Sequence, residues 1–205
     1  LDTSGTLHRT RSIFVLLTYS ECGSLPLGII ITTSENENSL KSGFRVLNEL
    51  LGESIFGGNK GGPAFFMTDD SALEQKAIGD TWPQAKLLLN GFHVLRRVSR
   101  WLSKSKNNIP KDKQSEFFND FRNILYAKNT SEVMEKLKFA LQNAQEFPNY
   151  IDYLKNYWWP KRDLWAKCYR NSDVFKNNHL ANYYESPVRQ IKETIFARTR
   201  GFNVV

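Results

Sequence analysis

The sequence is poor in cysteine and has no long apolar run. Its 205 residues include two cysteines, Cys22 and Cys168. Two cysteines so far apart fit neither a disulfide framework nor the paired spacing of a zinc finger, so we expect a reducing compartment. No apolar run is long enough to span a bilayer, and no charged-then-apolar leader opens the chain. We therefore expect neither a membrane protein nor a secreted one.

Acidic residues are fewer than basic ones. The chain has 28 Lys and Arg against 21 Asp and Glu, which gives a formal net charge of +7 at pH 7. Such a surface favours a polyanionic partner, although a merely basic soluble protein is the alternative. The length suits one compact domain with a real core and is short for two large ones.

Several common catalytic and repeat patterns are missing. The glycine-rich residues 57–62 contain Lys60 but lack the Gly-Lys-Ser/Thr ending and the following helix of a phosphate-binding loop. No serine has a histidine-and-acid pattern that indicates a hydrolase triad. The chain also has no internal repeat and no low-complexity tract.

The first half of the chain alternates strands and helices. Residues 13–18 and 25–32 are apolar, β-branched runs joined by a polar turn at 19–24, which is typical of a hairpin of central strands. Leu1-Asp2 fits the tail of a preceding strand. Residues 38–51 have helical apolar spacing and end at Gly52, a typical helix stop.

The same alternation continues to residue 102. We predict strands at 65–67 and 87–89, a helix at 71–78 with Ser71 as its N-cap, and a helix at 93–102. The resulting order of elements is the one expected of an α/β protein with a ribonuclease H-like mixed sheet flanked by helices.

The second half has a different character. Apolar residues recur at helical intervals with charges between them, and we interpret residues 110–170 as an all-helical insertion. Residues 129–131 (Asn-Thr-Ser) predict a helix break with a cap. We expect a final helix or helix pair at 178–199, after the insertion, so that one domain spans 1–205.

Two acidic residues follow the predicted strand at 65–67. In open α/β sheets, sites lie at the carboxyl ends of strands, so Asp69 and Asp70 are candidate metal ligands. Asp69 is preferred because it lies next to the apolar strand. For Asp70, capping of the following helix is the competing role.

The order of several motifs resembles the catalytic domain of Mutator-like element (MULE) transposases. The matching segments are Leu1-Asp2-Thr3-Ser4-Gly5, Thr68-Asp69, Pro83-Gln84-Ala85, Leu87-Leu88-Leu89 with Asn90-Gly91-Phe92-His93, and Asn177-Asn178 through Glu185-Ser186. The resemblance covers nearly the whole chain. It implies a ribonuclease H-like fold of the DDE superfamily.

The resemblance implies an acidic triad of Asp2, Asp69 and Glu185. Phosphodiester cleavage by this fold uses two divalent ions held by carboxylates, and hard oxygen ligands imply Mg²⁺ or Mn²⁺. From the residues alone, Asp2 also fits a solvated N-terminal residue, and Glu185 fits a solvated glutamate on a basic helix.

A histidine motif follows the second of the predicted short strands. The family has Cys or Asp, two intervening residues and His at this point, and this chain has Asn90 and His93. Asn90 removes an ionisable group but can still accept a hydrogen bond. We treat His93 as a secondary site residue, with a purely structural role as the alternative.

Two clusters of basic and aromatic residues are candidate DNA-binding surfaces. Cations neutralise phosphates, and aromatic faces stack on unpaired bases. The alternative is that the tryptophans form the core of the insertion. The first cluster has Arg96, Arg97, Arg100 and Trp101; the second has residues 157–162 with Lys161 and Arg162, plus Trp165 and Arg170; Arg189 and Lys192 follow near the C-terminus.

The resemblance implies a transposase that hydrolyses DNA phosphodiesters and transfers the freed strand. The expected partners are transposon ends and target DNA, with a homo-oligomer possible, no membrane and no small-molecule substrate, in the nucleus. Because the chain starts one residue before Asp2, we expect an N-terminally truncated domain, and a catalytically inactive nucleic-acid-binding or interaction remnant is the alternative.

Overall fold

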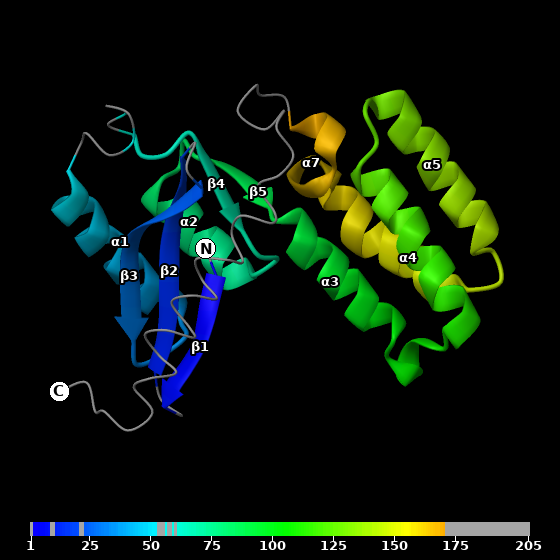
Figure 1. Ribbon diagram of the computed structural model, residues 1–205, viewed down its shortest axis with the longest axis horizontal. Helices are drawn as coiled ribbons and strands as arrows, with labels where there is room; N and C mark the ends of the chain where they lie inside the picture. The colour runs from blue at the N-terminus through cyan, green and yellow to red at the C-terminus, as the bar shows by residue number, and fades with distance from the viewer. Residues whose placement is uncertain are drawn as a thin grey trace. The chain divides into compact units, whose positions relative to one another are not determined.

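The computed structural model describes residues 2–8, 11–20, 23–52, 56, 59 and 61–170. These residues form a mixed α/β structure and divide into two compact units, separated between Leu87 and Leu88. We call residues up to 87 the sheet unit and those from 88 to 170 the helical unit, and Figure 1 labels their elements.

The sheet unit begins with a three-stranded antiparallel sheet in the order β1-β2-β3. The strands are β1 (Asp2–His8), β2 (Arg11–Ser20) and β3 (Gly23–Thr32). In β2, every residue from Ser12 to Leu16 is buried, including Ile13 and Val15, whose side chains alternate with those of Phe14 and Leu16. The middle strand is therefore covered on both faces.

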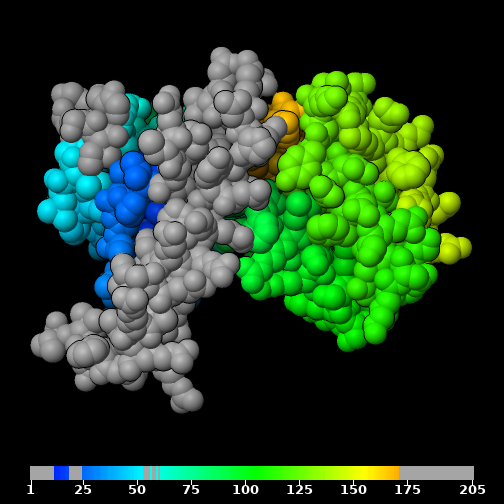
Figure 2. All heavy atoms as spheres, in the orientation of Figure 1, coloured from blue at the N-terminus to red at the C-terminus, as the bar shows by residue number. Residues whose placement is uncertain are grey.

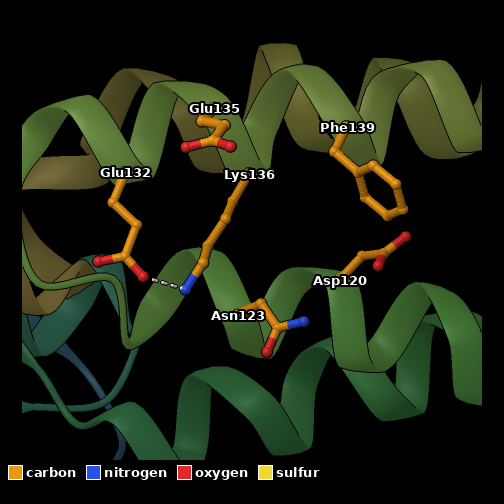
Figure 3. Close-up of a pocket in the computed structure, with 6 residues that line it drawn as sticks. All are labelled: Asp120, Asn123, Glu132, Glu135, Lys136 and Phe139. Atoms are coloured by element: carbon orange, nitrogen blue, oxygen red, sulfur yellow. Dashed lines mark ion pairs between the residues drawn. The ribbon is translucent and has the colours of Figure 1, made fainter.

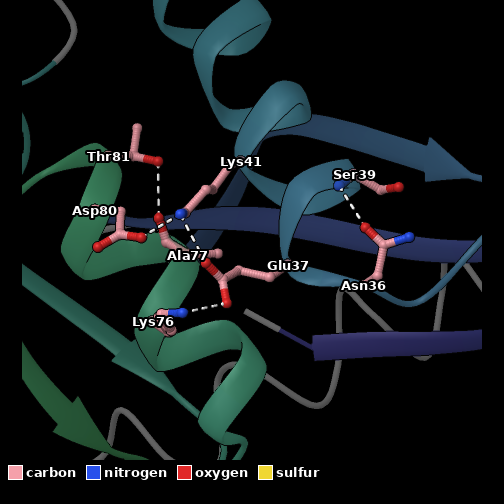
Figure 4. Close-up of polar contacts among 8 residues, drawn as sticks. All are labelled: Asn36, Glu37, Ser39, Lys41, Lys76, Ala77, Asp80 and Thr81. Carbon is pink, nitrogen blue, oxygen red and sulfur yellow. Dashed lines mark hydrogen bonds and ion pairs between the residues drawn. The ribbon is translucent and has the colours of Figure 1, made fainter.

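Helix α1 (Glu37–Leu51) packs against one face of this sheet. Its Leu40, Phe44 and Leu47 are buried with Phe14 and Ile30, because apolar residues at helical spacing form one stripe. Asn36 caps the helix, since its side chain accepts a hydrogen bond from Ser39 N at 2.8 Å (Figure 4).

Helix α2 (Ala72–Thr81) lies beside α1 and is joined to it by ion pairs. Lys41 pairs with Glu37 at 2.7 Å and with Asp80, and Lys76 pairs with Glu37 at 2.8 Å (Figure 4). Hydrogen bonding from Lys41 lowers the pKa of the Glu37 carboxyl. These contacts orient the two helices at the surface.

Two four-residue strands, β4 (Phe65–Thr68) and β5 (Lys86–Leu89), form a second sheet on either side of α2 in the sequence. Trp82, at the end of α2, is 3% exposed and packs on Phe44 and Phe66 with ring centroids 5.1 and 5.6 Å apart. This aromatic cluster holds β4 in place, and with it the residues that directly follow β4.

The helical unit begins with the last two residues of β5, and the described elements that follow them are all helical. They are α3 (Gly91–Leu102), η1 (Ser105–Asn107), α4 (Lys111–Leu125), α5 (Thr130–Asn143), α6 (Pro148–Asp152), η2 (Tyr153–Trp158), η3 (Trp159–Lys161), α7 (Arg162–Trp165) and η4 (Lys167–Tyr169). Of these, η2 is a π-helix. In space-filling view, the green to yellow side chains of α3, α4 and α5 form one continuous surface (Figure 2).

The core of the helical unit is rich in aromatic residues. Phe121 is fully buried against Trp158 and Trp165, with ring centroids 5.4 and 4.9 Å away. Phe117 stacks on Tyr150 at 4.6 Å, and the Tyr150 hydroxyl donates to the Phe117 carbonyl at 2.8 Å. Burial raises the pKa of Tyr150. Large flat side chains thus join α4 to the chain from α6 to α7.

Most predicted elements are confirmed, and their caps with them. The hairpin strands, α1 with its end at Gly52, α2 with Ser71 as N-cap and the helical character of residues 110–170 all match. Asn129 caps α5 by accepting from Glu132 N at 2.8 Å. The predicted helix at 178–199 lies outside the described residues.

Three features of the strands differ from the prediction. The described strands form two separate sheets, β1-β2-β3 and β4-β5, whereas a single mixed sheet was predicted. The first strand begins at Asp2 and runs on to His8, whereas Leu1-Asp2 had the pattern of a strand tail. Residues 3–6 are small, with no apolar side chain among them, yet the strand pairs with β2, where Asp2 lies opposite Val15 and His8 opposite Arg11. The turn between β2 and β3 is also shorter than the predicted 19–24, because the ladder runs on to the pair Ser20 and Gly23.

Candidate functional site

Asp69 and Asp70 stand in the short connection between β4 and α2. In β4, Phe66 and Thr68 are buried and alternate with half-buried neighbours, so the strand holds a fixed orientation up to its last residue. Both aspartates are half-buried. The helix then begins at once, because Ser71 accepts from Glu74 N at 3.4 Å. The capping role considered for Asp70 belongs to Ser71.

A buried hydrogen bond holds this connection in place. Thr68, 1% exposed, donates its hydroxyl to the carboxylate of Glu74, which is 3% exposed. The side chain of Gln75 donates to the Asp69 carbonyl at 3.4 Å. The backbone on both sides of Asp69 is therefore anchored to the first turn of α2.

Glu74 was missed by reasoning from the sequence. The signal was present, because Ser71 and Glu74 have the Ser-x-x-Glu spacing of a capping box. The Ser71 half of the box is present, and the Glu74 carboxylate also accepts a hydrogen bond from the Thr68 hydroxyl. Glu74 thus contacts the last residue of β4, directly before Asp69.

The structure describes two of the three members of the predicted triad. Asp2 is the first residue of β1, in the same unit as β4, and Asp69 follows β4 directly. Glu185, Arg189 and Lys192 lie outside the described residues. Among the residues that are described, no three His, Cys, Asp or Glu side chains are grouped closely enough to hold a metal ion.

Asn90 and His93 lie at the start of α3. The Asn90 side chain caps the helix by accepting from Phe92 N at 3.0 Å, so the predicted hydrogen-bond acceptor is confirmed. His93 is half-buried in the first turn, with its ring 5.5 Å from that of Phe92. These two residues belong to the helical unit, whereas Asp69 belongs to the sheet unit.

Helix α3 separates its apolar and basic residues. Val94, Val98 and Leu102 are buried at helical spacing, whereas the arginines between them are exposed. Residues 88–111 contain six Lys or Arg and no Asp or Glu. The exposed cations of this stretch, as far as η1, are Arg96, Arg97, Arg100, Lys104 and Lys106.

Three aromatic rings form a column beside these arginines. Trp101 of α3 stacks on Tyr153 with centroids 4.2 Å apart and planes 3° from parallel, and Tyr153 stacks on Tyr157 at 5.5 Å and 16°. Lys161 Nζ lies 3.7 Å from the centroid of the Tyr157 ring. Arg97 donates to the Tyr157 hydroxyl. Two cations thus contact the exposed end of the column.

The other tryptophans of this region divide between core and surface. Trp158 and Trp165 are fully buried, and Trp165 Nε1 donates to the Trp158 carbonyl at 2.9 Å, so these two form core as the alternative interpretation predicted. Trp159 is half-buried and lies under a cation, with Arg162 Cζ 4.8 Å from its ring centroid.

Arg170 is a structural residue and not part of a DNA-binding surface. Its guanidinium donates to the Leu89 carbonyl at 2.5 Å and to the Trp165 carbonyl at 3.1 Å. Burial lowers the pKa of this guanidinium to about 10. Arg170 therefore ties the end of β5 to α7, and the prediction that grouped it with the basic surface is wrong.

A pocket between α4 and α5 has the opposite charge. Its volume is about 350 Å³ (Figure 3). Lys136 pairs with Glu132 at 2.5 Å, while Asp120 accepts from the Asn143 side chain at 2.9 Å, and burial raises the pKa of Asp120. The lining residues are Asp120, Asn123, Glu132, Glu135, Lys136 and Phe139. The cations of α3 and η1 and the acids of this pocket therefore lie on different helices.

The longer helices of both units bury one side and expose the other, as α1, α3 and α4 illustrate. None of the helices in the described ranges is both long and apolar enough to cross a lipid bilayer. No protein-family model matches this chain, and neither does any curated protein.

Proposed function

We propose that this protein acts on DNA as a transposase-type catalytic domain with a ribonuclease H-like fold. In this proposal it hydrolyses a phosphodiester bond and transfers the freed strand. The element order from β1 to α3, three strands followed by alternating helices and strands, supports the fold. The ordered motifs that resemble MULE transposases support the activity.

The observation that carries the proposal is the strand end at Asp69. A carboxylate that follows a buried strand directly, on a backbone held by the Thr68 to Glu74 hydrogen bond, has a fixed position. Catalytic groups need such positioning, because small displacements cost large factors in rate. Asp69 meets that requirement better than a carboxylate on a free loop would.

The proposed metal ligands are Asp2, Asp69 and Glu185. Carboxylate oxygens suit hard divalent cations, so the chemistry of this donor set fits Mg²⁺ or Mn²⁺. When bound, such ions activate the attacking oxygen and stabilise the leaving oxygen.

The helical unit supplies the proposed DNA contacts. Arg96, Arg97 and Arg100 are exposed on α3, and Lys161 and Arg162 lie over aromatic rings in the following elements. Cations that neutralise phosphates provide most of the sequence-independent affinity for DNA. In this proposal the sheet unit cuts the DNA that the helical unit holds.

The test is metal-dependent nicking of a supercoiled plasmid by the purified chain. Asp69→Asn keeps the size of the side chain and removes its charge, and we expect the nicking rate to fall by at least about 100-fold. Asp70→Asn is the matched control and should stay within a few-fold of the wild type. Unchanged nicking by the Asp69→Asn protein would contradict the proposal.

A second function is a nucleic-acid-binding remnant without catalysis. The cations of α3 favour it, because their placement depends on the helical core and not on the strand-end acids. In that case the wild-type protein binds DNA but does not nick it with Mg²⁺ or Mn²⁺, and replacing Asp2, Asp69 and Glu185 leaves binding unchanged. The same plasmid assay, combined with a binding measurement, separates the two functions.

A further inference from the structure

We propose that the face formed by α3, η2 and η3 binds the phosphate backbone of double-stranded DNA and does not stack on unpaired bases. This inference rests on the proposed DNA function and specifies the form of DNA that the helical unit holds. It departs from the expectation that the aromatic residues serve as stacking platforms for bases.

The rings on this face are already engaged within the protein. Tyr157 stacks on Tyr153, carries Lys161 Nζ 3.7 Å from its centroid, and accepts a hydrogen bond from Arg97 through its hydroxyl. A base that stacked on Tyr157 would compete with these contacts. Base stacking contributes about 1–3 kcal/mol per base only where the ring face is open.

Trp159 shows the same arrangement. Arg162 lies over its ring, with Cζ 4.8 Å from the centroid, and Arg162 Nη1 donates to the Trp159 carbonyl at 3.1 Å. Two contacts from one arginine fix the guanidinium on the indole. A cation over an aromatic face gains about 0.5–2 kcal/mol, which a base would have to replace.

The rings therefore position cations. Lysine and arginine side chains lose much conformational freedom when they bind a phosphate, and holding them beforehand reduces that cost. Lys161 and Arg97 are held at the end of the ring column, and Arg162 is held on Trp159. The π-helix η2 carries both Tyr153 and Tyr157 of the column, and π turns are frequent at functional sites.

The exposed cations of α3 extend this positive surface along the helix. Arg96 and Arg100 are four residues apart and so lie on the same side of α3. From Arg96 to Arg100 the helix advances roughly 6 Å, which matches about two phosphates along one strand of a duplex. Within the described part of the chain, neither Arg96 nor Arg100 has an ion pair with a carboxylate.

The experiment measures binding of the full chain to a labelled duplex and to one of its single strands by fluorescence anisotropy. Metal-free buffer and the Asp69→Asn background prevent cleavage, and the salt concentration is varied between about 50 and 200 mM. We expect the duplex to bind more tightly than the single strand. Tighter binding of the single strand would overturn the inference.

Two sets of variants identify the face. R96Q/R100Q should weaken duplex binding and reduce the slope of log affinity against log salt by about 2. R122Q/K138Q removes the same charge from exposed positions on α4 and α5 and should leave that slope unchanged. Equal slopes for R96Q/R100Q and the starting protein would contradict the inference. Circular dichroism confirms that each variant is folded.

Trp159→Leu tests the stacking alternative directly. Because Trp159 holds Arg162, we expect the variant to lose at most a few-fold in affinity for the duplex and no more than that for the single strand. A stacking platform would instead lose single-strand affinity selectively, by about tenfold or more. Such a loss would contradict the inference. If the chain binds no DNA at all, the inference and the proposed function both fail. If duplex binding follows the expected pattern but the wild type does not nick DNA, only the proposed catalytic function fails.

Discussion

The two units of this protein present their charged groups in different ways. In the sheet unit, Asp69 takes its position from the backbone, because β4 buries alternate residues up to Thr68, its last one, and Asp69 follows directly. In the helical unit, Arg97, Lys161 and Arg162 take theirs from aromatic side chains that they contact. Positioning by the backbone suits a few catalytic groups that must converge on one point. Positioning by contacts with neighbouring side chains suits cations that are spread along a polyanion.

The largest predicted effect tests whether each unit depends on its own core. Phe44 and Phe121 are both fully buried, in separate clusters. Truncation of either to alanine should cost about 3–5 kcal/mol of unfolding free energy, measured by urea denaturation. Hydrogen exchange should show lost protection in α1 and α2 for Phe44→Ala, and in α4 and α5 for Phe121→Ala. Loss of protection in both units from either variant would contradict separate cores.

The next largest predicted effect compares the stability of two glycine-to-alanine variants within the sheet unit. Gly62 has φ +98°, and a Cβ there would lie 2.1 Å from Trp82 Cδ1, so Gly62→Ala meets both backbone strain and a clash with the aromatic cluster. We expect a loss of about 2–4 kcal/mol by urea denaturation.

Gly79 is the matched control for Gly62. It lies in α2, and a Cβ added there would meet no atom within 4 Å, so Gly79→Ala should stabilise the protein by about 0.5–1 kcal/mol. If Gly79→Ala lost as much stability as Gly62→Ala, the clash with Trp82 would not be the cause of the loss in Gly62→Ala.

The smallest predicted effect concerns the start of the helical unit. Asn90→Ala removes the side chain that accepts from Phe92 N and should cost about 1 kcal/mol, seen as a lower Tm. Asn90→Asp keeps an acceptor and places a negative charge at a helix N-terminus, which is favourable, so its Tm should equal or exceed that of the wild type. A lower Tm for Asn90→Asp than for Asn90→Ala would contradict a capping role.

Local patterns in the sequence were sufficient to predict most elements and their caps. Ser71, Asn129 and Gly52 mark helix ends through backbone rules that act within four residues. The extent of β1 was not predictable in this way. Residues 3–6 are small and carry no apolar side chain, so the signal for a strand is weak there, and pairing with β2 makes them one.

The position of Asp69 in the sequence of elements was easier to predict than the side-chain contacts of the basic residues. The strand end at Asp69 follows from an apolar run and an acidic pair, which are adjacent in sequence. The contacts of Arg97 with Tyr157 and of Arg170 with Leu89 join residues 60 and 81 positions apart. Sequence spacing carries no information on such contacts, which explains why Arg170 was wrongly placed on the basic surface.

The division of roles between the two units is tested most directly by single-turnover plasmid nicking, with the rate measured against protein concentration. For R96Q/R100Q we predict the wild-type maximal rate, reached at higher protein concentration, because binding is weakened and the acids are intact. For Asp69→Asn we predict an unchanged midpoint and a maximal rate lower by at least about 100-fold. A wild-type maximal rate for Asp69→Asn would contradict the assignment of cleavage to the strand-end acid of the sheet unit.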